Sequence, residues 1–186
     1  MSLLPLGLLS QGGGAGGAGA FEQIQTVFGT GSSGTITFSS IPATYKHLQI
    51  RVSARSNDDN AISNLRMTLN GDSAANYSWH FMQGFGTGQW SSSGVSASLI
   101  ALRDILSGTS GNIPGSLIID LLDYTDTNKF KTVRAFSGLT NGTTQNQVSL
   151  ISGNWRSTSA INSLSLSIAM GSFITSSRFS LYGIKG

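Results

Sequence analysis

The two histidines are the residues best suited to acid–base or metal chemistry. His47 and His80 are the sequence's only histidines, and the chain has no cysteine. A zinc or iron site needs several histidine, thiolate or carboxylate ligands. Neither histidine has another histidine at the spacing of metal ligands. Without cysteine, disulfides and iron–sulfur clusters are excluded as well. We therefore predict no metal site and no cofactor, and we interpret both histidines as surface imidazoles.

The other catalytic groups give no local signature. The composition does not exclude a Ser-His-Asp triad, because the three residues of such a triad can be far apart in the sequence. However, the chain has no Gly-x-Ser-x-Gly segment, the motif that presents the serine nucleophile in many hydrolases. The chain has one glutamate and seven aspartates. Asp120 and Asp123, three residues apart in a strand, would lie on opposite faces and could not form the carboxylate pair of a glycosidase. We predict that the protein is not an enzyme.

Two oxygen-rich segments have the composition of either a calcium site or a turn. Asp123, Asp126 and Asn128 form the first, and residues 57–60, Asn-Asp-Asp-Asn, form the second. Their spacing is not that of an EF-hand loop. Asp and Asn side chains bind their own backbone in turns, so we favour the turn interpretation for both segments.

Trp90 is the aromatic residue most suited to binding. It lies among glycines, serines and Gln89 in residues 84–94, which we expect to form a long loop. An exposed ring beside amides and hydroxyls can stack on the apolar face of a sugar or anchor a protein interface. We predict a receptor or interface contact made by Trp90, with Gln89 and Ser91 as adjacent hydrogen-bonding groups.

The N-terminal twenty residues differ from the rest of the chain. Residues 1–10 are mostly apolar and residues 11–20 are almost entirely glycine and alanine. A secretory signal and a simple disordered tail are the alternatives, but no Lys or Arg precedes the apolar stretch. We predict an anchoring arm on a flexible Gly-rich leash that inserts into a neighbouring protein or a symmetry mate. Its apolar contacts would be Leu3, Leu4, Leu6, Leu8 and Leu9.

The sequence predicts that β-strands form the framework that positions these residues. Within residues 45–55, Leu48, Ile50, Val52 and Ala54 alternate with polar side chains, which is the period-two pattern of a half-buried strand. About ten such segments occur between Gly-, Ser- and Asn-rich breaks, and no amphipathic helix of three turns appears. Residues 98–106 are ambiguous between a strand and a helical turn. We predict an all-β fold over residues 21–186: an antiparallel β-sandwich, jelly-roll-like, carrying the extended arm of residues 1–20.

The same alternation predicts which side chains form the core. The expected inward-facing residues are Leu48, Ile50, Val52, Leu65, Met67, Leu69, Leu117, Ile119, Leu121, Leu164, Leu166, Ile168, Phe179 and Leu181. Asn70-Gly71 is a strong turn signal, because both residues tolerate positive φ.

Charge and hydropathy limit the partners. Eleven Lys and Arg against eight Asp and Glu give a net charge of +3, and the basic residues are scattered. We therefore expect no nucleic-acid binding. No run approaches the roughly 20 apolar residues of a spanning helix, so we expect no membrane insertion.

Several segments resemble structural proteins of tailed bacteriophages. They are IPATYKHLQIR at residues 41–51, NGD at 70–72 with NYS at 76–78, DY at 123–124 through NKFKTV at 128–133, and FSLYGIK at 179–185. The resemblance spans residues 21–185. It implies a virion structural protein of the tail-fibre-like type, made in the host cytoplasm and carried on the extracellular particle, and it supplies no catalytic residues.

The resemblance leaves several functions to compare. The first is a tail fibre or appendage, anchored to other virion proteins by its arm, expected to be a homotrimer, and contacting the host surface, where a glycan is one partner to consider. The alternative is a capsid decoration protein that stabilises the shell. Two weaker alternatives are a carbohydrate-binding module and a glycan-degrading enzyme. The enzyme would need a carboxylate pair, and the chain has few acidic residues.

Overall fold

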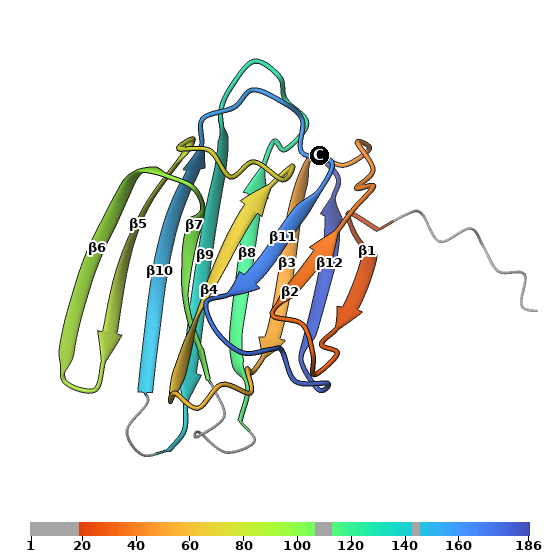
Figure 1. The fold of residues 1–186 in the computed structure, drawn as a ribbon. Coiled ribbons are helices and arrows are strands. Elements are labelled where there is room, and N and C mark those ends of the chain that lie inside the picture. The colour runs from red at the N-terminus through yellow and green to blue at the C-terminus, as the bar shows by residue number, and fades with distance from the viewer. Residues whose placement is uncertain (1–18, 107–112, 143–145) are drawn as a thin grey trace, which may run out of the picture.

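The computed structural model describes residues 19–106, 113–142 and 146–186, and these form an all-β domain of two antiparallel sheets (Figure 1). The predicted fold class is confirmed. The structure has more strands than the ten or so expected from the sequence. They are β1 (Phe21–Phe28), β2 (Thr35–Phe38), β3 (His47–Ala54), β4 (Ile62–Leu69), β5 (Tyr77–Phe85), β6 (Gly88–Ala97), β7 (Ile100–Leu106), β8 (Gly115–Leu122), β9 (Lys131–Thr140), β10 (Asn146–Trp155), β11 (Leu164–Ile168) and β12 (Arg178–Ile184).

Eight of the strands follow the order of a jelly roll. In the larger sheet the order β1-β12-β3-β8 lies opposite β2-β11-β4-β7, which is the whole of the smaller sheet. Numbered consecutively, these eight strands read 1-8-3-6 in one sheet and 2-7-4-5 in the other. That order is two Greek keys wrapped into a sandwich, so the jelly-roll prediction is correct.

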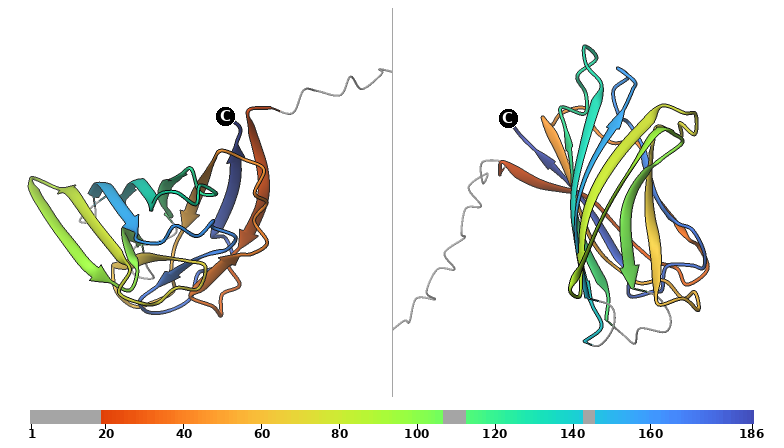
Figure 2. Two further views of the ribbon diagram at one scale, coloured as in Figure 1. Left: turned by 90° about the horizontal axis from the view of Figure 1, so that it is seen from above. Right: turned by 90° about the vertical axis from the view of Figure 1, so that its left-hand side faces the viewer.

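Two hairpins extend the larger sheet beyond the jelly roll. The β5–β6 hairpin is inserted between β4 and β7, and the β9–β10 hairpin between β8 and β11, which adds β9-β10-β5-β6 to the edge at β8. Figure 1 shows the smaller sheet in front of the larger one, with β5 and β6 projecting past it at the left. The two turned views show the sheets as separate layers (Figure 2).

The core lies between the two sheets and contains the residues that the alternation predicts. Thirteen of the fourteen predicted inward-facing side chains are buried, and the remaining one, Ile168, is half-buried and packs against the core. Ile50 has 0% of its surface exposed, whereas the neighbouring Gln49 lies on the half-exposed outer side. The predicted register is therefore confirmed for β3, because a slip of one residue would exchange these two faces.

The Asn70-Gly71 turn is also confirmed. It ends β4, and both residues have positive φ, 52° and 68°. Asn70 adds a structural role, since its side-chain amide donates a 2.8 Å hydrogen bond to the carbonyl of Ala160. A turn residue thus also fixes the chain that leads into β11.

The prediction of a long loop over residues 84–94 is wrong, because most of these residues lie in strands. β5 continues to Phe85 and β6 begins at Gly88, so the connection is a tight turn in which Gly86 has a φ of 53°. The sequence of β6 is polar and Gly-containing because it is an edge strand, with only one neighbour and little apolar surface to bury. The ambiguity over residues 98–106 resolves in favour of a strand, because β7 covers Ile100–Leu106.

Candidate interaction surfaces of the large sheet

The outer face of the large sheet, which points away from the smaller sheet, carries a row of exposed apolar side chains. Met82 on β5 is in register with Leu150 on β10, Leu150 with Phe136 on β9, and Phe136 with Ile118 on β8. The exposed fractions of these four residues are 63%, 58%, 50% and 43%. The solvated face of an antiparallel sheet is normally polar. We call these four residues the apolar row.

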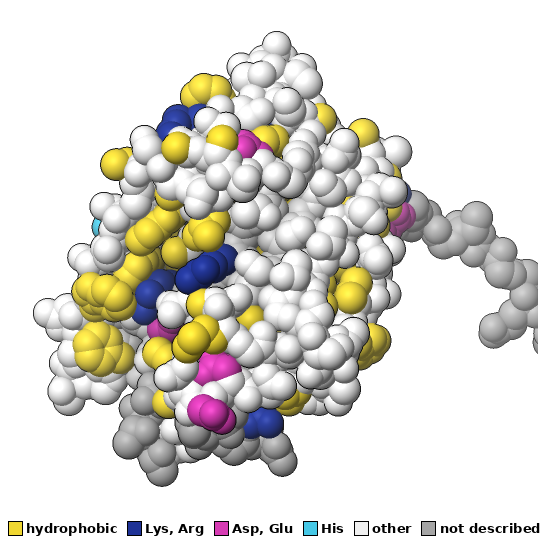
Figure 3. Space-filling model, viewed as in Figure 1, with side chains coloured by type: hydrophobic (Ala, Val, Ile, Leu, Met, Phe, Trp, Pro, Cys, Tyr) yellow, Lys and Arg dark blue, Asp and Glu magenta, His cyan; other side chains and the backbone are white. Residues whose placement is uncertain are grey.

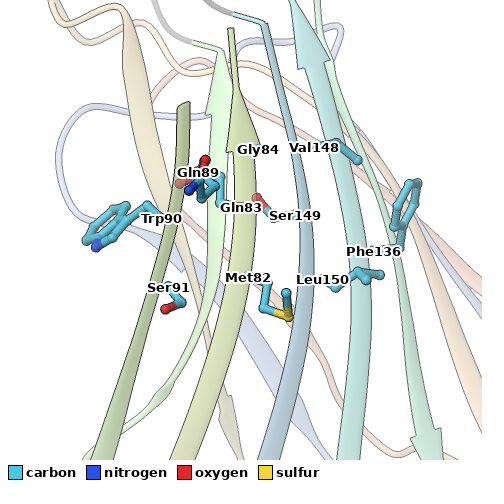
Figure 4. A pocket seen from close by; sticks show the side chains of 10 residues that line it. All are labelled: Met82, Gln83, Gly84, Gln89, Trp90, Ser91, Phe136, Val148, Ser149 and Leu150. Atoms are coloured by element: carbon cyan, nitrogen blue, oxygen red, sulfur yellow. The ribbon is translucent and has the colours of Figure 1, made fainter. Parts of the chain in front are cut away.

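Three hollows follow β5 and β10 across the apolar row. The largest has a volume of about 680 Å³, and the next, of about 310 Å³, shares Met82 and Leu150 with it. The third, of about 280 Å³, shares His80 and Ser152 with the second. Together they form one groove, the outer groove, that runs along the strands. The residues labelled in Figure 4 border its largest hollow, some with their side chains and others only with their backbone: Met82, Gln83, Gly84, Gln89, Trp90, Ser91, Phe136, Val148, Ser149 and Leu150.

The outer groove is almost free of charge. Among the described residues that line its three hollows, the ionisable side chains are His80 and Arg134, and there is no carboxylate. Hydroxyls and amides surround the apolar floor. Such a surface suits an uncharged, apolar partner better than a charged one.

Trp90 lies on the other side of the same sheet. It is paired with Gln83, and its ring meets the edge of the buried Phe81 ring at a centroid distance of 5.0 Å. The Arg103 guanidinium lies 4.6 Å from the Trp90 centroid and 4.2 Å from that of Phe81. The ring is held on one side and remains 48% exposed. Figure 3 shows hydrophobic and basic side chains gathered at the left of that view, where the smaller sheet leaves the larger one open.

The structure separates the three residues predicted to form a contact. Alternation along β6 places the side chains of Gln89 and Ser91 on the outer face, opposite Gly84 and Met82, while Trp90 faces the inner side. In Figure 4 the Trp90 ring lies apart from Met82, Leu150 and Phe136. Gln89 and Ser91 therefore line the outer groove, and Trp90 contributes its ring to a different surface.

Beneath Trp90 lies a buried polar cluster that the sequence did not predict. Arg103 Nη2 lies 2.9 Å from Asp104 Oδ2 and donates a 2.9 Å hydrogen bond to Gln83 Oε1. Gln83 Nε2 donates to Asp104 Oδ2 at 3.1 Å and also to Gln147. Burial raises the pKa of the Asp104 carboxyl and lowers that of Arg103, although each charge opposes the shift of the other. With 3% of Asp104 exposed, the cluster supports Trp90 rather than offering an accessible acid or base.

The histidines have separate environments. His47 Nδ1 accepts a 2.9 Å hydrogen bond from the backbone amide of Asp123, so its imidazole fixes a turn. His80 is exposed and lines the outer groove. Within the part of the chain that the structure describes, no three His, Asp or Glu side chains gather as metal ligands.

The turn interpretation of both oxygen-rich segments is confirmed. The Asp126 amide donates to the Asp123 carbonyl at 3.0 Å, and the Asn128 amide donates to Asp126 Oδ1 at 2.8 Å. In the other segment the Asn60 amide donates to Asp58 Oδ1 at 2.6 Å. Lys129 and Lys46 bind the Asp123 carboxylate, so cations of the chain itself already occupy it.

The predicted arm contacts, Leu3, Leu4, Leu6, Leu8 and Leu9, lie outside the described residues. Comparison of the chain with protein-family models, with curated proteins and with solved structures found no match. Over the described residues, no helix is long and apolar enough to cross a membrane.

Proposed function

We propose that the protein is a non-enzymatic structural component of a bacteriophage particle, a tail fibre or appendage, and that it binds neighbouring virion proteins through the outer groove. The observation that carries this proposal is the apolar row: four exposed apolar side chains in register on four adjacent strands. Contiguous apolar patches on a soluble domain mark interaction surfaces. The segments that resemble phage structural proteins are the reason for proposing a phage particle as the assembly that this surface joins.

The rest of the chain is suited to a particle that must last outside the cell. It has no cysteine to oxidise, few charges and many hydroxyl side chains. A jelly roll with two long hairpins presents a broad, rigid sheet on which neighbouring subunits can pack. These properties support a structural role more directly than a catalytic one.

The test is incorporation into particles of a groove variant, Met82→Ser with Leu150→Ser. Both side chains are exposed, so the variant should fold and keep its circular dichroism spectrum, yet purified particles should lack it. Met170→Ser is the matched control, because Met170 is 58% exposed and lies outside the outer groove. Normal incorporation of the groove variant would overturn the proposal. Labelling of intact particles by an antibody to this protein would separate a tail position from the decoration of the capsid.

A second function, recognition of a host glycan, is favoured by the Trp90 ring. An aromatic face that is half exposed and held by Phe81 and Arg103 is prearranged for stacking on a sugar. The test is binding of the full chain to a glycan array. Trp90→Phe should retain binding and Trp90→Ala should lose it, whereas equal binding by both variants would exclude a stacking role.

A further inference from the structure

We infer that the outer groove binds the leucine-rich N-terminal segment, residues 3–9, of a second copy of this chain. The inference rests on the proposed function and names the partner of the same surface. It joins two features: a groove that is apolar and almost free of charge, and an apolar segment that precedes the domain in the sequence.

The chemistry of the two surfaces matches. Residues 1–21 contain no ionisable side chain, and the groove lining contains no carboxylate within the described residues. In an extended chain Leu4, Leu6 and Leu8 project to one side. They would contact Met82 and Leu150 on the groove floor, and the Ser and Gln side chains at its border would remain in water.

The lengths also match. The hollows extend along β5 from the level of Ser78 to that of Gly84, which is roughly 19–20 Å at the usual rise of a strand. Seven residues in extended conformation span roughly 20–23 Å. Pro5 lies in the middle of the segment and has no backbone N–H, which disfavours adding the segment to a sheet edge as a new strand. Docking on the face of the sheet uses side-chain contacts and does not need the backbone N–H that proline lacks.

The position of β1 favours a second copy over the chain's own segment. β1 is the opposite edge of the large sheet, five strand spacings from β10, or about 24 Å. A Gly-rich chain of eleven residues has a root-mean-square length of roughly 17–20 Å. To reach its own groove, the segment would have to stretch across the outer faces of β12, β3, β8 and β9. A neighbouring copy can be placed without that restriction.

Exchange of such segments is a heterologous contact, because the segment of one copy meets the groove of the next. Repeated around an axis, it closes into a ring of identical subunits. The trimer expected for a fibre or appendage is one such ring.

The decisive experiment uses disulfide trapping in the full-length chain, which has no cysteine of its own. Chains with Leu6→Cys and chains with Leu150→Cys are mixed and oxidised, and we expect a cross-linked dimer that contains one of each. A mixture of Leu6→Cys with Met170→Cys is the control and should give no cross-linked dimer of the two chains. Equal products in both mixtures would overturn the inference.

A double variant separates the chain's own segment from that of a neighbour. Leu6→Cys with Leu150→Cys in one chain should give cross-linked oligomers on a non-reducing gel. A monomer with an internal disulfide would show that each groove holds its own segment, and the second-copy inference would then be wrong.

Sedimentation analysis provides an independent measurement. The wild-type chain should form oligomers, while the groove variant Met82→Ser/Leu150→Ser and the segment variant Leu6→Ser/Leu8→Ser should each be monomers. A mixture of the two variants should recover a complex, because one supplies an intact segment and the other an intact groove. If the wild-type chain is a monomer while the groove variant still fails to enter particles, this inference fails and the proposed function stands.

Discussion

Arg103 and Asp104 are consecutive residues of β7, yet their side chains form a buried ion pair on one side of the strand, with 2.9 Å between Nη2 and Oδ2. Consecutive side chains of a regular strand point to opposite faces. Here the φ of Arg103 is 69°, and the pairing of β4 with β7 shifts register between Leu65 and Arg66. The bulge turns both charges toward Gln83 and places the guanidinium beneath Trp90.

We expect Arg103→Leu to destabilise the fold by about 3–5 kcal/mol, because Asp104 would remain buried without its cation. The free energy of unfolding in urea measures this. The double variant Arg103→Leu/Asp104→Leu should be more stable than the single one, since it leaves no unpaired charge. A single variant as stable as the wild type would show that the ion pair has no structural role.

The Asp123 carboxylate gives a pH dependence of stability. Hydrogen bonds from Lys129 and Lys46 lower the pKa of Asp123 from 3.8 to about 2. A carboxyl group whose pKa is lower in the folded state adds stability above its unfolded pKa and loses it as the pH falls through its folded pKa. The wild-type advantage over Asp123→Asn should therefore be full at pH 7 and disappear between about pH 4 and pH 2.

Urea unfolding of both proteins across this pH range is the measurement. Asp59→Asn is the control for the substitution itself, because Asp59 is an exposed aspartate in another turn. A constant difference between wild type and Asp123→Asn from pH 7 to pH 2 would contradict the assignment.

The central strands were predictable because their burial follows sequence alternation. Leu48, Ile50 and Val52 face the core as their spacing requires. In β7, by contrast, Leu102, Arg103, Asp104 and Ile105 are all buried, because the bulge interrupts the alternation on which the prediction depends. An Arg-Asp pair within the apolar run of residues 99–106 was the signal that could have been noticed.

The interaction surfaces were less predictable because they depend on the pairing of strands distant in sequence. Met82 and Phe136 join one row only because β10 lies between their strands, and no local pattern contains that order. Trp90 was expected in a loop because β6 is polar and Gly-containing. Its ring was correctly expected to be accessible, but the structure places Gln89 and Ser91 on the other face.

Two glycines on neighbouring strands provide a matched test of packing. A Cβ added to Gly153 on β10 would lie 2.8 Å from Cγ2 of Ile100, whereas one added to Gly138 on β9 meets nothing within 4 Å. Gly153→Ala should therefore cost about 1–3 kcal/mol through overpacking. Gly138→Ala should be neutral or add about 0.4–1 kcal/mol, because alanine restricts the unfolded chain. Thermal unfolding of the two variants measures the contrast, and equal shifts in Tm would refute the overpacking argument.

Lys131 connects the turn before β9 to the chain after β10, and its removal should loosen both. The residue is 1% exposed, and its Nζ donates to the carbonyls of Lys129 at 3.0 Å and Thr158 at 3.1 Å, and to that of Asp126. Lys131→Met keeps the apolar stem but leaves these carbonyls without their donor, so we expect a loss of about 1–3 kcal/mol. Arg134→Met, an exposed change on the same strand, should stay within about 0.5 kcal/mol of the wild type. Hydrogen exchange should be faster near residues 126–131 and 157–159 in Lys131→Met alone. Unchanged exchange there would mean that the lysine does not hold the two segments together.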